Sequence, residues 1–394
     1  MVLRCLIVDD VPVKREHVER VVLSVADCSI TVAATVFDAA RLLRRAHFDL
    51  AIIDLVLPMR EGAEPSTRGG QQLLATINGL CACDHVVGLT AFEDAHLAQA
   101  QEFEAALWSL IRYDELGSSW IDLLSSKVEH IAQSRVRSRA YAVDVLVLSA
   151  LTATELEAVL KLPADWKHGP VDDWPHWLGR LTTDRGEKTL VAMASHEMGM
   201  SAASAVAMRA IVQFRPRYLL MVGIAAGIEG DFGDVLVATT CWDYGAGKTA
   251  KSLEGRIVFR PAPKQIQVAP ELQAKLAELA MVRPVLTDAY EAFTGPKPGH
   301  LPTIRLGPVA SGAAVIENVD VLAELRAANR KVIGVEMETY GVFSAATIAP
   351  EPRPLFASMK SICDFADSWK NDRYQEYAAH TSAALMWEFV RRFV

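Results

Sequence analysis

The chain opens with Leu3–Asp10, which reads LRCLIVDD, a short apolar strand that ends in two acidic residues. Amphipathic segments separate it from four further apolar stretches of similar length, which are Ile30–Ala34, Leu50–Ile53, Val86–Leu89 and Leu107–Ile111. Strands that alternate with helices at this spacing are typical of parallel βαβ units. The pattern therefore predicts an α/β fold with a doubly wound parallel sheet.

A basic, polar stretch interrupts this alternation at Gln133–Arg139, and a new apolar strand, Val143–Leu148, follows it. The chain has 394 residues, whereas one domain takes about 150 residues. We therefore expect a first domain at residues 1–133, a linker at 134–142 and a second α/β domain at 143–394.

The composition excludes several classes of protein. With 51% hydrophobic and 22% charged residues the chain can fill sizeable cores, and its net charge of −8 offers no global basic field for nucleic acid. No apolar run reaches the ~18 residues that a membrane-spanning helix needs. The six cysteines are scattered among apolar stretches, which favours reduced thiols. We expect a cytoplasmic protein without nucleic-acid or membrane partners.

Acidic residues follow two strands of the first domain. Asp9 and Asp10 come after the first strand and Asp54 after the third, and Thr90 ends the fourth. In a doubly wound sheet these strand ends share one edge, where three carboxylates would suit Mg²⁺ and Thr90 could bind a phosphoryl oxygen. The alternative is that each is merely a polar residue at a strand end.

The first domain resembles the receiver domain of two-component response regulators. The matching segments are Leu6–Asp10, Ile52–Pro58 and Gly88–Ala91. The resemblance implies a flavodoxin-like fold, with a cognate histidine kinase as partner.

The resemblance also implies roles for single residues. Asp54 would accept the phosphoryl group, Asp9 and Asp10 would hold Mg²⁺ with it, and Thr90 would take part in switching. Receivers carry a Lys-Pro pair after the fifth strand, where this chain has Arg112. Arg112 is thus the expected switch cation, although its forked guanidinium differs from a lysine ammonium.

Further carboxylates follow separate strands of the second domain. Glu155 lies after the strand at Val143, and Glu338 and Asp364 end two later apolar segments. Between them, the small residues Ala225 and Gly227 allow a ligand to approach the backbone closely. Paired carboxylates suit acid–base cleavage at a sugar carbon, but carboxylates at strand ends are also common helix caps.

Residues 143–394 resemble the nucleoside phosphorylase and nucleosidase superfamily, which implies a three-layer α/β fold. The matching segments are Met198–Ala203, Val222–Gly227, Gly233–Val237, Ser311–Ile316, Val335–Glu338 and Ser361–Asp364.

This resemblance implies that Asp364 protonates N7 of a purine, Glu338 binds the ribose hydroxyls, and Glu155 activates water. Further residues are expected to bind the substrate: Met337 against the sugar, and Val315 and Ile316 around the base. Superfamily members are usually oligomers, so a homo-oligomer is expected, and the nucleosidase chemistry requires no cofactor.

A receiver joined to a nucleosidase domain resembles the effectors of Detocs antiphage systems, which are ATP nucleosidases. The resemblance implies that phosphorylation at Asp54 switches on the release of adenine from ATP. A triphosphate needs cations, and Lys360 is the preferred candidate because it lies four residues before Asp364. Other candidates, each read first as a solvated surface charge, are Lys248, Lys251, Arg256, Arg260, Lys264, Arg330 and Lys331.

Two other functions stay open. One is a methylthioadenosine/S-adenosylhomocysteine nucleosidase or a purine nucleoside phosphorylase. The other is a nucleotide sensor without catalytic activity, which would have no need for an acid at N7. Met198, the first residue of the first matching segment, is interpreted as a core residue.

Overall fold

A computed structural model describes residues 2–91, 103, 106, 108–170, 174–251, 257–282, 284–313, 319–365 and 372–394. It divides into two compact units, Met1–Ser138 and Arg139–Val394. Helix α5 (Ser119–Arg139) runs through the first part of the expected linker, and β6 (Val143–Ser149) begins directly after that linker.

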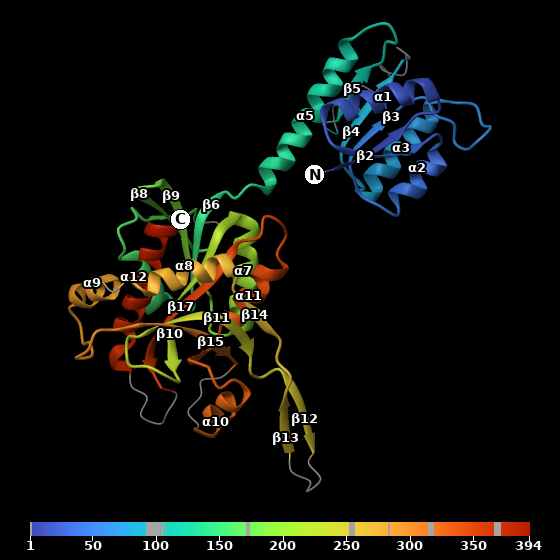
Figure 1. The fold of residues 1–394 in the computed structure, drawn as a ribbon. Coiled ribbons are helices and arrows are strands. Elements are labelled where there is room, and N and C mark those ends of the chain that lie inside the picture. The colour runs from blue at the N-terminus through green and yellow to red at the C-terminus, as the bar shows by residue number, and fades with distance from the viewer. Residues whose placement is uncertain are drawn as a thin grey trace. The chain divides into compact units, whose positions relative to one another are not determined.

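The N-terminal unit is built on a five-stranded sheet in which every paired strand is parallel to its neighbour (Figure 1). The strands are β1 (Leu3–Val8), β2 (Cys28–Ala33), β3 (Phe48–Ile53), β4 (Cys83–Thr90) and β5 (Ser109–Arg112). Their order is β2-β1-β3-β4-β5, the order of the flavodoxin-like doubly wound fold. The predicted parallel sheet is therefore present.

Helices cover both faces of this sheet. One hydrophobic core contains apolar residues of α2 (Val36–Leu43) and α3 (Thr67–Leu80), and the other contains those of α1 (Pro12–Val25) and α5. The chain crosses from one face to the other around β1 and β3, which lie side by side. The residues that follow these two strands consequently meet at one edge, where ligands bind in such sheets.

The C-terminal unit contains a ten-stranded mixed sheet with helices on both faces (Figure 1). Most strands follow the order β14-β11-β15-β16-β10-β6-β9-β8-β7, and β17 pairs with β10 and β11. The strands after β6 are β7 (Lys167–His168), β8 (Trp177–Thr183), β9 (Gly186–Ala194), β10 (Pro216–Gly227), β11 (Val235–Asp243), β14 (Gln265–Gln267), β15 (Ile304–Ser311), β16 (Gly334–Glu336) and β17 (Leu355–Asp364).

The helices form the outer layers of this unit. Apolar residues of α7 (Met200–Phe214) and α11 (Thr339–Ile348) share one core with the sheet, and those of α6 (Glu157–Leu160), α8 (Pro270–Ala280) and α12 (Gln375–Phe393) share the other. The unit thus has the expected three layers. Two further helices are α9 (Pro284–Ala292) and α10 (Val319–Ala328).

A two-stranded hairpin, β12 (Gly247–Lys251) and β13 (Ile257–Pro261), extends away from this unit (Figure 1). It leaves the sheet after β11. In the described part of the chain, no helix is both long and apolar enough to cross a membrane.

Candidate active site

A cavity of about 150 Å³ opens where several strands of the C-terminal unit end. The cavity is lined by residues that follow β6 and by residues at or just after the ends of β10, β16 and β17. Met198, which follows β9, and the first residue of α12 also line it. They are Ala150, Leu151, Glu155, Met198, Ile224, Ala225, Ala226, Val335, Glu336, Met337, Glu338, Cys363, Asp364 and Gln375.

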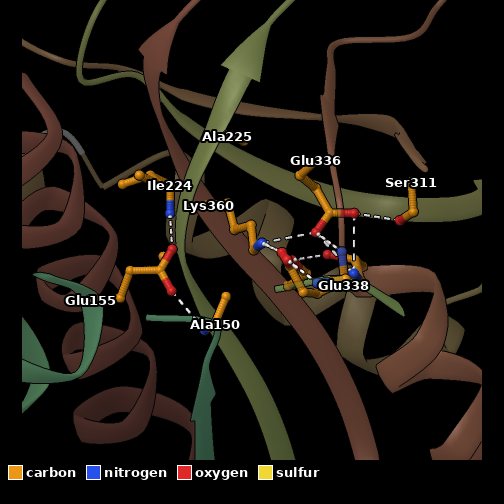
Figure 2. Close-up of polar contacts among 12 residues, drawn as sticks. Ala150, Glu155, Ile224, Ala225, Ser311, Glu336, Glu338 and Lys360 are labelled. Carbon is orange, nitrogen blue, oxygen red and sulfur yellow. Dashed lines mark hydrogen bonds and ion pairs between the residues drawn. The ribbon is translucent and has the colours of Figure 1, made fainter. Parts of the chain in front are cut away.

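Glu155 lies in a short π-helix, Thr152–Leu156, that follows β6, and is almost completely buried. One carboxylate oxygen accepts hydrogen bonds from the backbone N–H of Ala150 (2.6 Å) and Leu151 (2.9 Å), and the other from Ile224 (2.8 Å; Figure 2). Burial raises the pKa of Glu155, while Lys360 and the backbone donors act in the opposite direction. The loop after β6 and the end of β10 thus fix this carboxylate at the cavity wall.

Gly223 makes room for Glu155. Its φ of +149° lies in a region that residues with a side chain rarely adopt, and a Cβ at this position would collide with Oε1 of Glu155. The backbone conformation in β10 that presents the N–H of Ile224 to the carboxylate therefore requires glycine.

A second group of charges is buried beside the cavity. The Lys360 ammonium contacts Oε2 of Glu336 at 2.9 Å and Oε2 of Glu338 at 2.6 Å (Figure 2). None of the three side chains is more than 4% exposed. Although burial raises the pKa of Glu336, its ion pair with Lys360 and its hydrogen bonds lower it below the usual value.

Backbone and hydroxyl donors hold the two glutamates. Glu336 accepts hydrogen bonds from the Ser311 hydroxyl and from the N–H groups of Glu338 and Thr339. Oε1 of Glu338 accepts the N–H of Gly199 at 2.9 Å. Glu336 thus joins β15, β16 and the start of α11, and it sets the position of Glu338 at the cavity.

Asp364 is the last residue of β17 and is half-buried at the cavity wall. The Cys363 thiol donates a hydrogen bond to its Oδ2 at 3.3 Å. Three carboxylates from different segments, Glu155, Glu338 and Asp364, therefore line the same space, and Met337 and Ala225 line it with them.

Two expected substrate ligands lie elsewhere. Gly227 does not line the cavity, because it packs against Ile362, whose Cδ1 would be 2.7 Å from an added Cβ. Lys360 is 2% exposed, and its ammonium is engaged by Glu336 and Glu338. The expectation that Lys360 binds phosphate is therefore wrong, because its buried ammonium already forms ion pairs with two carboxylates.

The remaining predictions for the C-terminal unit have different outcomes. Val315 and Ile316 lie outside the described residues, as does Arg256. Met198, interpreted from the sequence as a core residue, is 54% exposed and lines the cavity. Glu336 was not identified from the sequence as the residue that holds Lys360 and the backbone of Glu338 in place, although it belongs to the matching segment Val335–Glu338.

The acidic residues of the N-terminal unit also come together. Carboxylate oxygens of Asp9, Asp10 and Asp54 lie within 4.8 Å of one another, close enough to share one metal ion. Burial is the largest influence on Asp9 and Asp10, and it raises the pKa of both. Thr90 is fully buried at the end of β4.

The cation that contacts Asp54 comes from an unexpected element. Lys14, on α1, lies 2.5 Å from Oδ2 of Asp54 and 2.9 Å from Oδ2 of Asp9. Arg112, the cation expected from the sequence, is exposed at the end of β5. The sequence prediction missed Lys14 because nothing in its local pattern distinguishes it from a surface lysine of an amphipathic helix.

Comparison with known proteins adds to this geometry. The phosphorylase superfamily model matches residues 144–391. The protein y4jS of Sinorhizobium fredii, whose activity is uncharacterized, is 32% identical over 412 residues, with both chains covered completely. The ATP nucleosidase Cap17 of Escherichia coli is 26% identical over 306 residues, which span 71% of this chain and 56% of Cap17.

Solved structures with a similar fold include two from Helicobacter pylori. Its futalosine hydrolase is 20% identical, with a TM-score of 0.47 and coverage of 63% of this chain and 97% of that one. Its 5'-methylthioadenosine/S-adenosylhomocysteine nucleosidase is also 20% identical, with a TM-score of 0.48 and coverage of 64% and 99%. Since the family model spans well over half of the sequence, the chain belongs to the phosphorylase superfamily.

Proposed function

We propose that this protein is a nucleosidase that hydrolyses the N-glycosidic bond of a purine nucleotide, with ATP as substrate and adenine as a product. The observation that carries the proposal is that Glu155, Glu338 and Asp364 line a single cavity. The similarity to the ATP nucleosidase Cap17 supports ATP as the nucleotide.

Each carboxylate has a role that its position supports. Cleavage builds positive charge on the ribose and negative charge on the departing base. Asp364 protonates the base at N7, and such acid catalysis typically contributes about 10²–10⁴ in rate. Glu155 accepts a proton from the attacking water, and Glu338 binds the ribose hydroxyls and stabilises the cationic sugar electrostatically.

Glu336 and Lys360 support this chemistry indirectly. Lys360 compensates the charge of Glu338 within the protein, and Glu336 holds both Lys360 and the backbone N–H of Glu338. Because Oε1 of Glu338 is bound by Gly199 and Oε2 by Lys360, the carboxylate enters the reaction already oriented.

The triphosphate requires cations from outside the cavity wall, since the described residues that line it include no lysine or arginine. The hairpin β12–β13 offers them. The hairpin follows Asp243 at the end of β11. Asp243 is the strand partner of Ser311 in β15, and Ser311 is the strand partner of Glu336 in β16, which lines the cavity. On the hairpin, the exposed Lys248 and Arg260 lie directly opposite each other.

Two like charges in directly opposed positions destabilise a strand pair, and an anion bound between them would offset their repulsion. We therefore assign Lys248 and Arg260 as the phosphate-binding pair.

We further propose that the N-terminal unit is a receiver. Asp54 accepts a phosphoryl group from a histidine kinase, and this modification raises the activity of the C-terminal unit, as suits an antiphage effector. Asp9, Asp10 and Asp54 supply the carboxylate oxygens that Mg²⁺ prefers, so the residues present fit this cation. Bound Mg²⁺ would neutralise charge on the phosphoryl oxygens.

The direct test measures free adenine after incubation of the purified protein with ATP, AMP, adenosine or methylthioadenosine, without added phosphate. We expect release from ATP, and loss of at least about 100-fold in Asp364→Asn, from the usual contribution of a general acid. Asp184→Asn, in the exposed turn between β8 and β9, is the matched control and should keep full activity.

Other outcomes would point to the other functions. Release from methylthioadenosine alone would indicate a methylthioadenosine-type nucleosidase, and a requirement for phosphate would indicate a phosphorylase. Binding of ATP without release of adenine would favour the sensor. Light scattering of the same sample checks the proposed homo-oligomer.

A further inference from the structure

The acidic cluster of the N-terminal unit contains its own cation. Lys14 lies in the first turn of α1, and only 5% of its surface is exposed. Its ammonium contacts Asp9 and Asp54 and donates a third hydrogen bond, of 2.9 Å, to the carbonyl oxygen of Leu89. The ring of Tyr113 lies 5.3 Å from the same ammonium. All three ammonium donors thus have partners.

Lys14 contacts the carboxylate oxygens of Asp9 and Asp54 that accept no backbone hydrogen bond. Oδ1 of Asp9 accepts the N–H of Val11 at 2.9 Å, and Oδ1 of Asp54 accepts the N–H of Val56 at 3.1 Å. In both residues the other oxygen, Oδ2, is the one bound to Lys14. The ammonium therefore occupies the two carboxylate oxygens that the backbone leaves to a cation.

We propose that Lys14 is a resident counter-ion that competes with Mg²⁺ for Oδ2 of Asp9 and Asp54. This inference rests on the proposed Mg²⁺ site. A divalent ion binds when the ammonium leaves these oxygens. Lys14 therefore sets the Mg²⁺ concentration at which the acidic cluster binds the ion and Asp54 can accept a phosphoryl group. Lys14 is a positioning residue here, since it acts through the carboxylates.

The position of Lys14 strengthens this inference. α1 begins directly after the loop that carries Asp9 and Asp10, and the ammonium also reaches Leu89, next to Thr90 in β4. Displacement of Lys14 would therefore release contacts to both strand ends that border Asp54. The effect of Mg²⁺ would reach α1 and the end of β4 together.

The test is calorimetric titration of the full chain with MgCl₂ alone. Lys14→Gln removes the competing charge, and we expect it to bind Mg²⁺ at least tenfold more tightly than the unmodified chain. Arg20→Gln removes the same charge from an exposed position on the same helix, and its affinity should be unchanged. Asp54→Asn should lose the binding.

Thermal unfolding provides a second readout that allows for a loss of stability. Without Lys14, the carboxylates have no internal counter-ion, so Lys14→Gln should unfold at a lower temperature in EDTA. Saturating Mg²⁺ should then raise its Tm by more than it raises that of the unmodified chain or of Arg20→Gln.

The outcomes separate this inference from the site on which it rests. Equal or weaker Mg²⁺ binding by Lys14→Gln, with loss in Asp54→Asn, would overturn the competition and leave the Mg²⁺ site in place. No binding by any variant would reject both. A Tm gain in Mg²⁺ that is the same for all variants would likewise contradict the competition.

Discussion

At the scale of single residues, the candidate site depends on charges that compensate one another in the interior. Lys360 neutralises part of the negative charge of Glu336 and Glu338, and its influence extends to Glu155. Such a pair contributes little net stability, but removing one partner leaves an uncompensated buried charge. Lys360 is therefore a structural requirement of the site.

Replacement of Lys360 by Met should lower the free energy of unfolding by about 3–5 kcal/mol, the usual effect of breaking a buried ion pair. Urea denaturation followed by circular dichroism measures this loss. Lys331→Met, at an exposed position, should change stability little. Adding Glu336→Gln to Lys360→Met should restore part of the loss, and a further loss would argue against charge compensation as the cause.

The pH dependence of catalysis should report Glu155. This residue acts as a base when ionised, and its pKa is raised by burial. Activity should therefore fall as the pH decreases through a pKa above the ordinary value of 4.5. The profile of kcat against pH for adenine release measures this limb. An acidic limb at or below 4.5 would contradict the assignment of Glu155 as the base.

At the scale of elements, strand ends were predictable, whereas the partners of charged side chains were not. Apolar runs and the polar residues after them located β1, β3 and β6, and with them Asp9, Asp54 and Glu155. The small residues of 222–227 continue β10, because β17 and β16 pair along them, and this extension of the strand was not apparent from the sequence.

The partners of Lys14 and Lys360 could not be predicted, because each pairing depends on the tertiary fold. Lys14 lies 40 residues from Asp54, and Lys360 lies 22 residues from Glu338. Both lysines occur in segments whose local pattern is equally compatible with a solvated charge. Only the packing of α1 on its sheet, and of β17 between β10 and β11, brings them to carboxylates.

The triphosphate proposal can be tested by substitutions in the hairpin β12–β13. Lys248→Gln and Arg260→Gln should each raise KM for ATP about tenfold or more, from the loss of a charge-assisted contact of about 1.5–3 kcal/mol. Neither should change kcat/KM for adenosine, which has no phosphate. Lys331→Gln serves as the control, and an equal effect on both substrates would point to a structural role for the hairpin.

At the scale of the whole molecule, two units with separate cores share one chain. The proposed modification site lies in the first unit and the proposed chemistry in the second, so control requires a change in affinity or rate that passes between them. The acidic cluster is the only group of three carboxylates close enough to share one ion within the described residues, since the other such group contains a histidine.

Treatment with a small-molecule phosphodonor and Mg²⁺ should therefore raise adenine release from ATP, and Asp54→Ala should abolish this increase while keeping the basal rate. Rates measured with and without the donor, in both proteins, provide the comparison. Asp122→Ala, at an exposed position of the same unit, should respond like the unmodified chain. An increase that persists in Asp54→Ala would remove Asp54 as the acceptor.

Gly223 has a practical consequence for any survey of this protein by saturation mutagenesis. The backbone there turns with φ of +149° against the carboxylate of Glu155. A library at position 223 should return only glycine among active clones, and alanine scanning would score the site as strongly as Glu155 itself. A residue without a side chain would thus register as essential, because what it contributes is the space that the Glu155 carboxylate fills.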